Sequence, residues 1–218
     1  MLARVPLPLA VLAAVAALVL GAVLAPLAPW AERTPGETSA EAGFARDMSV
    51  HHAQAVAMSA MAFDRSTDTE VRAVALDIAT SQQAQIGTMS AWLAEWGLPQ
   101  RSDTPQMAWM DPVDGTDHAQ HATGLMPGMA TREEMQELAA ARGPEFDALW
   151  ARLMHAHHRG GLPMAEQVIA KTDREPVVLL ATSMRDSQSA ELEVLEDIAA
   201  RAGGSVGDAH AGPHASHG

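Results

Sequence analysis

The stretch Met48-Ser49-Val50-His51-His52, followed by Met58, occurs a second time in the same chain. The second copy consists of Met154, His157, His158 and Met164, each 106 positions after its counterpart. Later pairs keep this offset without a gap: Val71 and Val177, Ala75 and Ala181, Gln82 and Gln188, Gln85 and Glu191, and Gly97 and Gly203. Unrelated helices would rarely share such a set at one spacing. We interpret the pattern as an internal duplication.

Apolar residues recur at spacings of three and four along most of the chain, which is typical of amphipathic helices. We expect four long helices, at about 41–63, 69–96, 144–171 and 176–202, and a short helix that begins at Thr131. Thr67 or Asp68 is a suitable N-cap, and Thr131 with Glu134 forms a capping-box pattern. Glycines follow the second and fourth long helices. No segment has the alternation of a strand, so the sequence predicts an all-α fold.

Two helical hairpins related by duplication can each bury an apolar stripe against the other, as in a four-helix bundle. The expected bundle spans residues 41–204. Its halves are residues 41–97 and 131–204, joined by a Met- and His-containing loop at 98–130. Residues 32–40 read as a tether, and residues 205–218 as a disordered tail.

The first 31 residues have the character of a membrane-directed segment. No charged residue occurs from Val5 to Ala31, and Arg4 precedes this apolar run. The run is long enough for a transmembrane anchor, but it also fits a secretory signal with small residues near its end. In either case the residues that follow are expected outside the cytoplasm. A buried core helix is the remaining alternative.

The composition narrows the classes of binding site. The chain has no Cys, which excludes disulfides and thiolate metal sites. Its net charge of −13 argues against nucleic-acid binding. It contains 13 Met and 10 His, whose thioether and imidazole groups suit copper. Met is also a common filler of helical cores, so the count alone does not establish a site.

The duplicated motif places its Met and His residues on one broad face of each helix. Two such faces, brought together by the duplication, would offer four His and four Met. The predicted metal ligands are Met48, His51, His52, Met58, Met154, His157, His158 and Met164. Thioether sulfur favours Cu(I), and imidazole binds several transition metals, so we expect copper, with Cu(I) favoured and other transition metals open. His155 has Ser49 as its counterpart, and we assign it no role.

Polar residues also interrupt the apolar stripes of the other two long helices. They are Gln82, Gln85, Gln188 and Glu191. Polar groups on a buried face are costly unless they are hydrogen-bonded. We therefore expect these side chains to accept the second ring N–H of the metal-binding histidines and so to orient the rings.

Two further segments carry weaker candidate ligands. The loop contains Met107, Met110, His118, His121, Met126 and Met129. The tail contains His210, His214 and His217. A loop of this length is either functional or disordered, so its residues are an auxiliary copper-binding set or part of a flexible linker. The histidines of the solvated tail would bind metal weakly and promiscuously.

The sequence from Phe44 to Met58 resembles the signature of the family catalogued as domain of unknown function 305, and the stretch from Gly143 to Met164 resembles it again. The resemblance implies a ferritin-like four-helix bundle outside the cytoplasm, with copper binding and copper tolerance in some members. It implies the same eight Met and His ligands. The chain departs from the family pattern at Gly160, Gly161 and Pro163, which would weaken or kink the third long helix.

We therefore expect an extracytoplasmic metal-binding protein that sequesters copper, confers tolerance to it or transfers it. The expected contacts are a metal ion, the membrane through the N-terminal helix, and a metal-transfer protein or a second copy of the chain. A metal-dependent oxidase on the same bundle, or a structural module without metal, are the alternatives. The chain has no Glu-x-x-His motif of the di-metal carboxylate oxidases, and we identify no catalytic residues.

Overall fold

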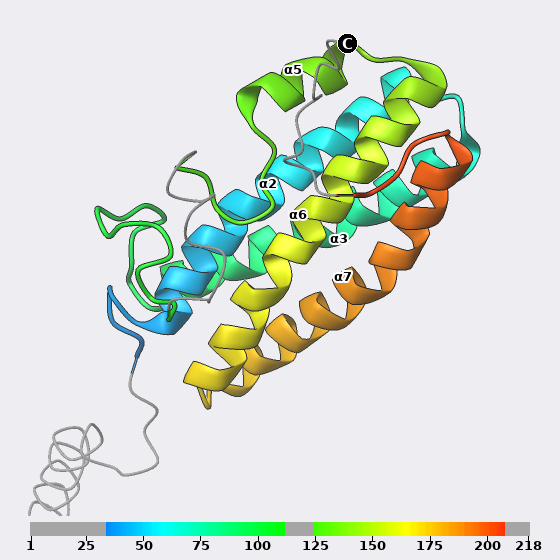
Figure 1. Cartoon of the computed structure of the whole chain (residues 1–218). Coiled ribbons are helices and arrows are strands. Elements are labelled where there is room, and N and C mark those ends of the chain that lie inside the picture. Colours follow the sequence, from blue (N-terminus) through cyan, green and yellow to red (C-terminus); the bar gives the residue numbers. More distant parts are fainter. Residues whose placement is uncertain (1–33, 112–123, 208–218) are drawn as a thin grey trace, which may run out of the picture. The chain divides into compact units, whose positions relative to one another are not determined.

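The computed structural model describes residues 34–111 and 124–207. The chain divides into the units Met1–Thr34 and Pro35–Gly218, and the helices below belong to the second. They are α2 (Ala40–Arg65), α3 (Thr69–Glu95), α5 (Arg132–Ala140), α6 (Gly143–Lys171) and α7 (Glu175–Arg201) (Figure 1). The described residues contain no strand. The expected all-α fold is confirmed.

The helix ends follow local chemistry. Asp68 caps α3, because its Oδ1 accepts from the backbone N–H groups of Glu70 and Val71. Thr131 and Glu134 form the expected capping box at the start of α5. Gly97 and Gly203, with φ of 69° and 82°, end α3 and α7 in the left-handed conformation that glycine adopts without strain.

The four long helices form two hairpins. Helix α2 packs against α3, helix α6 packs against α7, and the two hairpins meet mainly between α2 and α6 (Figure 1). Helices α2 and α6 run in opposite directions, so the start of one duplicated motif lies beside the end of the other. This arrangement is consistent with the expected ferritin-like bundle.

The core of the bundle has two parts, one on each side of the paired His-His motifs. We name them the Trp150 core and the Met89 core. The Trp150 core includes Met58, Ile78, Phe146, Trp150, Met154 and Leu195. The Met89 core includes Phe44, Met48, Met89, Met164, Val177 and Met184. Positions 106 apart fall in opposite cores, so the bundle is pseudo-symmetric, as the predicted duplication implies.

Helix α6 continues through the segment where the sequence suggested an interruption. Gly160, Gly161 and Pro163 all lie within one uninterrupted helix. A Cβ at Gly160 would collide with the carbonyl of Pro127, and a Cβ at Gly161 would lie 2.6 Å from Oε1 of Gln188. The glycines therefore permit close packing against α6, and tertiary contacts outweigh their low helix propensity.

The predicted N-terminal membrane or signal helix lies outside the described residues. Among the helices that the structure describes, none combines the length and apolar character needed to cross a bilayer.

Candidate metal centre

The eight predicted metal ligands are all buried. Met48, Met58, Met154, Met164, His51, His52 and His158 have no exposed surface, and His157 is 1% exposed. Buried imidazoles need hydrogen-bond partners or a ligand, because an unpaired polar atom in a core is costly. The position of each ring nitrogen therefore decides what this region can bind.

The four imidazoles lie in a row across the interface between α2 and α6. His51 and His157 are in contact, with ring centroids 3.8 Å apart and an interplanar angle of 34°. His52 lies beyond His51 at 6.4 Å between centroids, and His158 lies beyond His157 at 6.3 Å. We call His52, His51, His157 and His158 the His row. The structure thus joins the two motifs into one centre.

Each ring in the His row donates a hydrogen bond through Nε2. His51 donates to the Pro127 carbonyl at 2.9 Å, and His157 donates to the His51 carbonyl at 2.8 Å. The two outer rings pair with side chains: His52 with Oε1 of Gln85 at 2.7 Å, and His158 with Oε2 of Glu191 at 2.5 Å. Carbonyl and carboxylate oxygens only accept, so Nε2 carries the proton and Nδ1 keeps a lone pair.

Three of these four Nδ1 lone pairs lack a hydrogen-bond partner. Nδ1 of His51, His52 and His158 is buried without a hydrogen bond, and so is Oε1 of Gln82 and of Gln188. Buried polar atoms are rarely left unsatisfied, and each such atom needs an explanation. All five are acceptors, and a cation bound to an imidazole nitrogen would give that nitrogen a partner. The donor set therefore fits a metal ion held by imidazole nitrogen.

Two of the four side chains predicted to accept a second ring N–H do so, and two do not. Gln85 and Glu191 accept them from the outer histidines, as expected. Gln82 and Gln188 are buried, at 3% and 4% exposed, but do not accept them. For these two residues the predicted contact is wrong, because backbone carbonyls occupy Nε2 of the two central rings. Gln188 instead lies over Gly161, beside Cε1 of His51.

The four predicted thioether ligands are divided between the two cores. Met48 and Met164 belong to the Met89 core, and Met58 and Met154 belong to the Trp150 core. The His row lies between these pairs. No group of three His, Asp or Glu side chains in the described ranges is arranged to hold a metal. The centre thus offers imidazole pairs flanked by thioethers, a donor set suited to Cu(I) rather than to an ion that requires carboxylates.

Burial keeps the imidazoles of His51, His52 and His157 neutral. Loss of hydration lowers the pKa of His51 to about 4 and that of His52 to about 3. Burial also holds the pKa of His157 well below its ordinary value, and the neighbouring His51 lowers it further. Only the neutral ring can bind a metal, so these histidines are ready to act as ligands at pH 7.

The same pKa shifts predict acid sensitivity of the metal-free protein. Because an exposed imidazole has a pKa of 6.5, the unfolded chain takes up protons at His51 and His52 before the folded chain does. The stability that these neutral rings contribute is present above pH 6.5 and is lost as the pH falls toward about 4. We expect the free energy of unfolding to fall by on the order of 1 kcal/mol per pH unit for each ring.

Urea denaturation in the presence of a chelator, at pH 7, 6 and 5, measures this dependence. The variant H51L/H52L should show a flatter pH profile than the wild type. Identical profiles for the two proteins would contradict the burial of neutral rings.

A short strap covers the centre, and the sequence did not reveal its role. The strap consists of residues 125–130, and its Pro127 carbonyl accepts from His51. The amide of Gln54 fixes its end, since Oε1 accepts from Ala130 N at 2.7 Å and Nε2 donates to Ala130 O at 2.8 Å. Gly128 approaches the backbone of Ala156 so closely that a Cβ would collide with it. The glycines at positions 128 and 160 were the available signals of this contact.

The loop methionines lie near this centre, on the side of the Met89 core. Met126 in the strap is 4% exposed, while Met107, Met110 and Met129 are partly buried against the same core. Of the other auxiliary candidates, His118 and His121 lie outside the described residues, as do His210, His214 and His217. The structure therefore places the loop thioethers beside the bundle core.

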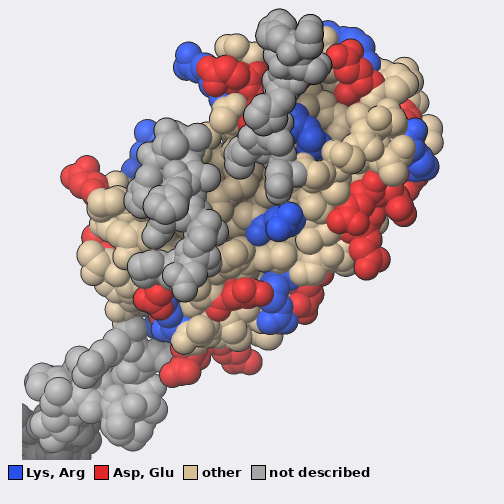
Figure 2. All heavy atoms as spheres, viewed as in Figure 1, with Lys and Arg blue, Asp and Glu red and all other residues tan. Residues whose placement is uncertain are grey.

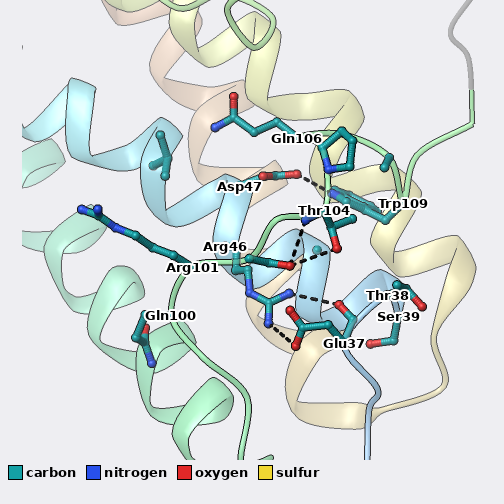
Figure 3. Close-up of a pocket in the computed structure, with 15 residues that line it drawn as sticks. Glu37, Thr38, Ser39, Arg46, Asp47, Gln100, Arg101, Thr104, Gln106 and Trp109 are labelled. Carbon is teal, nitrogen blue, oxygen red and sulfur yellow. Dashed lines mark hydrogen bonds and ion pairs between the residues drawn. The ribbon is translucent and has the colours of Figure 1, made fainter.

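Asp47 holds the first of these loop segments against α2. Its Oδ2 accepts from the backbone N–H of Met107 at 2.8 Å and from Nε1 of Trp109 at 2.9 Å. Asp47 and Trp109, whose hydrogen bond is dashed in Figure 3, both line a cavity of about 540 Å³. Burial raises the pKa of Asp47. None of the four histidines lines this cavity, so it is separate from the His row.

The surface is mixed in charge. On the face drawn in Figure 2, acidic and basic side chains of the described residues are interspersed. Together with the net charge of −13, this pattern favours attraction of cations over binding of polyanions.

The chain matches one protein-family model and is similar to several solved structures. The family model described as Domain of unknown function (DUF305) matches residues 41–199. A DUF305 protein of Streptomyces coelicolor, described as secreted, is 42% identical with a TM-score of 0.71, over 79% of this chain and 99% of that one. A DUF305 fragment from Deinococcus radiodurans is 30% identical, with a TM-score of 0.61, over 74% and 96%.

The protein CopM in its Cu(II)-bound form is 26% identical to the chain, with a TM-score of 0.56, over 75% of this chain and 97% of that one. CopM structures with Cu(I) and with Ag share the fold, with TM-scores of 0.54. A search of curated proteins finds no match.

Proposed function

Because this chain belongs to the family described as Domain of unknown function (DUF305), we propose that it is an extracytoplasmic copper-binding protein that sequesters the ion or passes it on. The His row is its binding centre, and Cu(I) is the favoured ion. The similar secreted protein supports the location, and the similar Cu(II)-bound CopM supports the metal.

The single observation that carries the proposal is the set of unpaired Nδ1 atoms in the His row. A purely structural histidine in a core has partners on both nitrogens or gives its place to an apolar residue. Here three rings keep an unused lone pair at the interface of the two hairpins. Their Nε2–H groups are meanwhile held by other parts of the fold, which fixes both the tautomer and the ring orientation.

The outer acceptors Gln85 and Glu191 orient the terminal rings in this proposal. They occupy equivalent positions in the two halves, yet only Glu191 carries a negative charge. A carboxylate makes the ring that it holds a better donor to the metal. The His158 end of the row is therefore the stronger binding end.

Transfer or storage is favoured over catalysis by the burial of the centre. The four rings and the flanking thioethers have almost no exposed surface, and the strap covers His51. Three of the four rings, those of His51, His52 and His157, are held neutral by burial, and thioethers carry no charge. Attachment to the membrane through the first 31 residues, or release as a secreted protein, is compatible with either role.

Titration with Cu(I) against a chromophoric competitor tests the proposal. The full-length wild type is compared with H51L/H52L/H157L/H158L, named the four-His variant, in which leucine keeps the core filled. We expect the tightest class of Cu(I) sites to be lost in the four-His variant while its helical circular dichroism is retained. A four-His variant that retains the tightest class of Cu(I) sites would place the function outside the His row.

A further inference from the structure

The two cores are equivalent in position but not in chemistry. A residue of one core has its counterpart, 106 positions away, in the other core. These pairs are Met48 and Met154, Met58 and Met164, Ile78 and Met184, and Met89 and Leu195. In the Trp150 core, the four long helices thus supply Met58, Ile78, Met154 and Leu195. In the Met89 core, the equivalent positions are all methionine: Met48, Met89, Met164 and Met184.

Packing alone does not require methionine at all four of these positions in the Met89 core. Leucine and isoleucine fill the equivalent α7 and α3 positions of the Trp150 core, where Leu195 and Ile78 are no more than 1% exposed. Met89 and Met184 are just as deeply buried in the Met89 core. The duplicated architecture therefore accepts branched aliphatic residues at these positions, and one end carries thioethers instead.

Additional thioethers gather at the same end of the bundle. Met126 of the strap joins the Met89 core, and it is 4% exposed. Met107, Met110 and Met129 pack against this core from outside and are partly buried. Thioethers thus extend from the partly exposed loop to the interior of the bundle.

We propose that Met48, Met89, Met164 and Met184, with Met126, form a second site in the Met89 core that binds a soft monovalent cation, Cu(I) or Ag(I), through sulfur alone. Thioether sulfur is a neutral, soft ligand that selects such ions over Zn²⁺, Ca²⁺ and Mg²⁺. This inference rests on the proposed function in one respect, since it assigns the same cargo to a second site, which takes Met48 and Met164 from the eight predicted ligands. The loop methionines offer a route from solvent to that site.

Silver(I) tests the second site without a change of oxidation state. Ag(I) is titrated in chloride-free buffer into the full-length wild type, the variant M89L/M184I and the control M61L/M135L. The first variant gives the Met89 core the residues of the Trp150 core. The control removes the same number of thioethers from Met61 and Met135, which are partly buried beside the Trp150 core.

We expect M89L/M184I to bind one Ag(I) fewer than the wild type and the control to bind the full number. Equal binding by the two variants, whether reduced or unchanged in both, overturns the proposal. The four-His variant is titrated in parallel: it should keep the sulfur site and lose the His row. If it binds as the wild type does, the proposed function fails, while the comparison of the two methionine variants still decides the second site.

Spectra of methionine methyl groups keep the test independent of variant stability. In the four-His variant labelled with ¹³C-methyl methionine, single changes M89L and M184I assign two methyl signals. Both signals should shift upon addition of Ag(I). Unshifted signals at an Ag(I) excess would overturn the proposal even if the double variant failed to fold.

Discussion

The double variant H51L/H157L is expected to bind Cu(I) at least about 100-fold more weakly than the wild type, since loss of a residue that only orients a ligand already costs about 10–100-fold. The centroids of these two rings are 3.8 Å apart, so replacement of both residues removes the middle of the His row. Leucine fills a similar volume, and the cores on both sides are retained. Competition with a chromophoric Cu(I) chelator measures the change.

His155 provides the matched control. It lies on α6 with His157 and is 5% exposed, its Nε2 pairs with Glu196 at 3.0 Å, and its counterpart in the first half is Ser49 rather than a histidine. The variant H155L should bind Cu(I) as the wild type does. If H155L and H51L/H157L weaken Cu(I) binding equally, the weaker binding results from a general disturbance of the helix and not from loss of the His row.

Two glycine-to-alanine changes in long helices are expected to shift stability in opposite directions. A Cβ at Gly160 would collide with the Pro127 carbonyl and with Gly128 N, which are backbone atoms of the strap. We expect G160A to lower the free energy of unfolding by about 1–3 kcal/mol. A Cβ at the exposed Gly87 in α3 would have no such neighbour within 4 Å, so G87A should raise the free energy of unfolding by about 0.5–1 kcal/mol.

Urea denaturation of the metal-free proteins gives both values. G160A should also weaken Cu(I) binding, because displacement of the strap removes the acceptor that fixes the His51 ring. A stable G160A protein with unchanged binding would show that the strap is not coupled to the centre.

The helices could be predicted because their determinants are local. Apolar spacing, the N-cap at Asp68, the capping box at Thr131 and the glycines after α3 and α7 act within one turn of the chain. The pairing of the two His-His motifs followed from the duplication, which places equivalent faces opposite each other. These features agree with the structure because no distant segment competes with them.

The remaining features depend on contacts between distant segments. The strap contributes a backbone carbonyl, which has no sequence signature. This carbonyl accepts the His51 Nε2–H hydrogen bond that a glutamine was expected to accept. The glycines of α6 read locally as helix breakers, although they serve close approach to Pro127 and Gln188. The four methionines of the Met89 core could be recognised as a set only from the structure. The two cores show which residues that differ between the halves occupy equivalent positions in the bundle.

Anomalous diffraction at the copper edge, from crystals of the Cu(I)-loaded protein, locates the bound ion relative to the His row. We predict an anomalous peak within bonding distance of Nδ1 of residues in the His row, between α2 and α6. Copper found only at the loop or tail, with the Nδ1 atoms of His51, His52 and His158 still unpaired, would contradict the proposed centre.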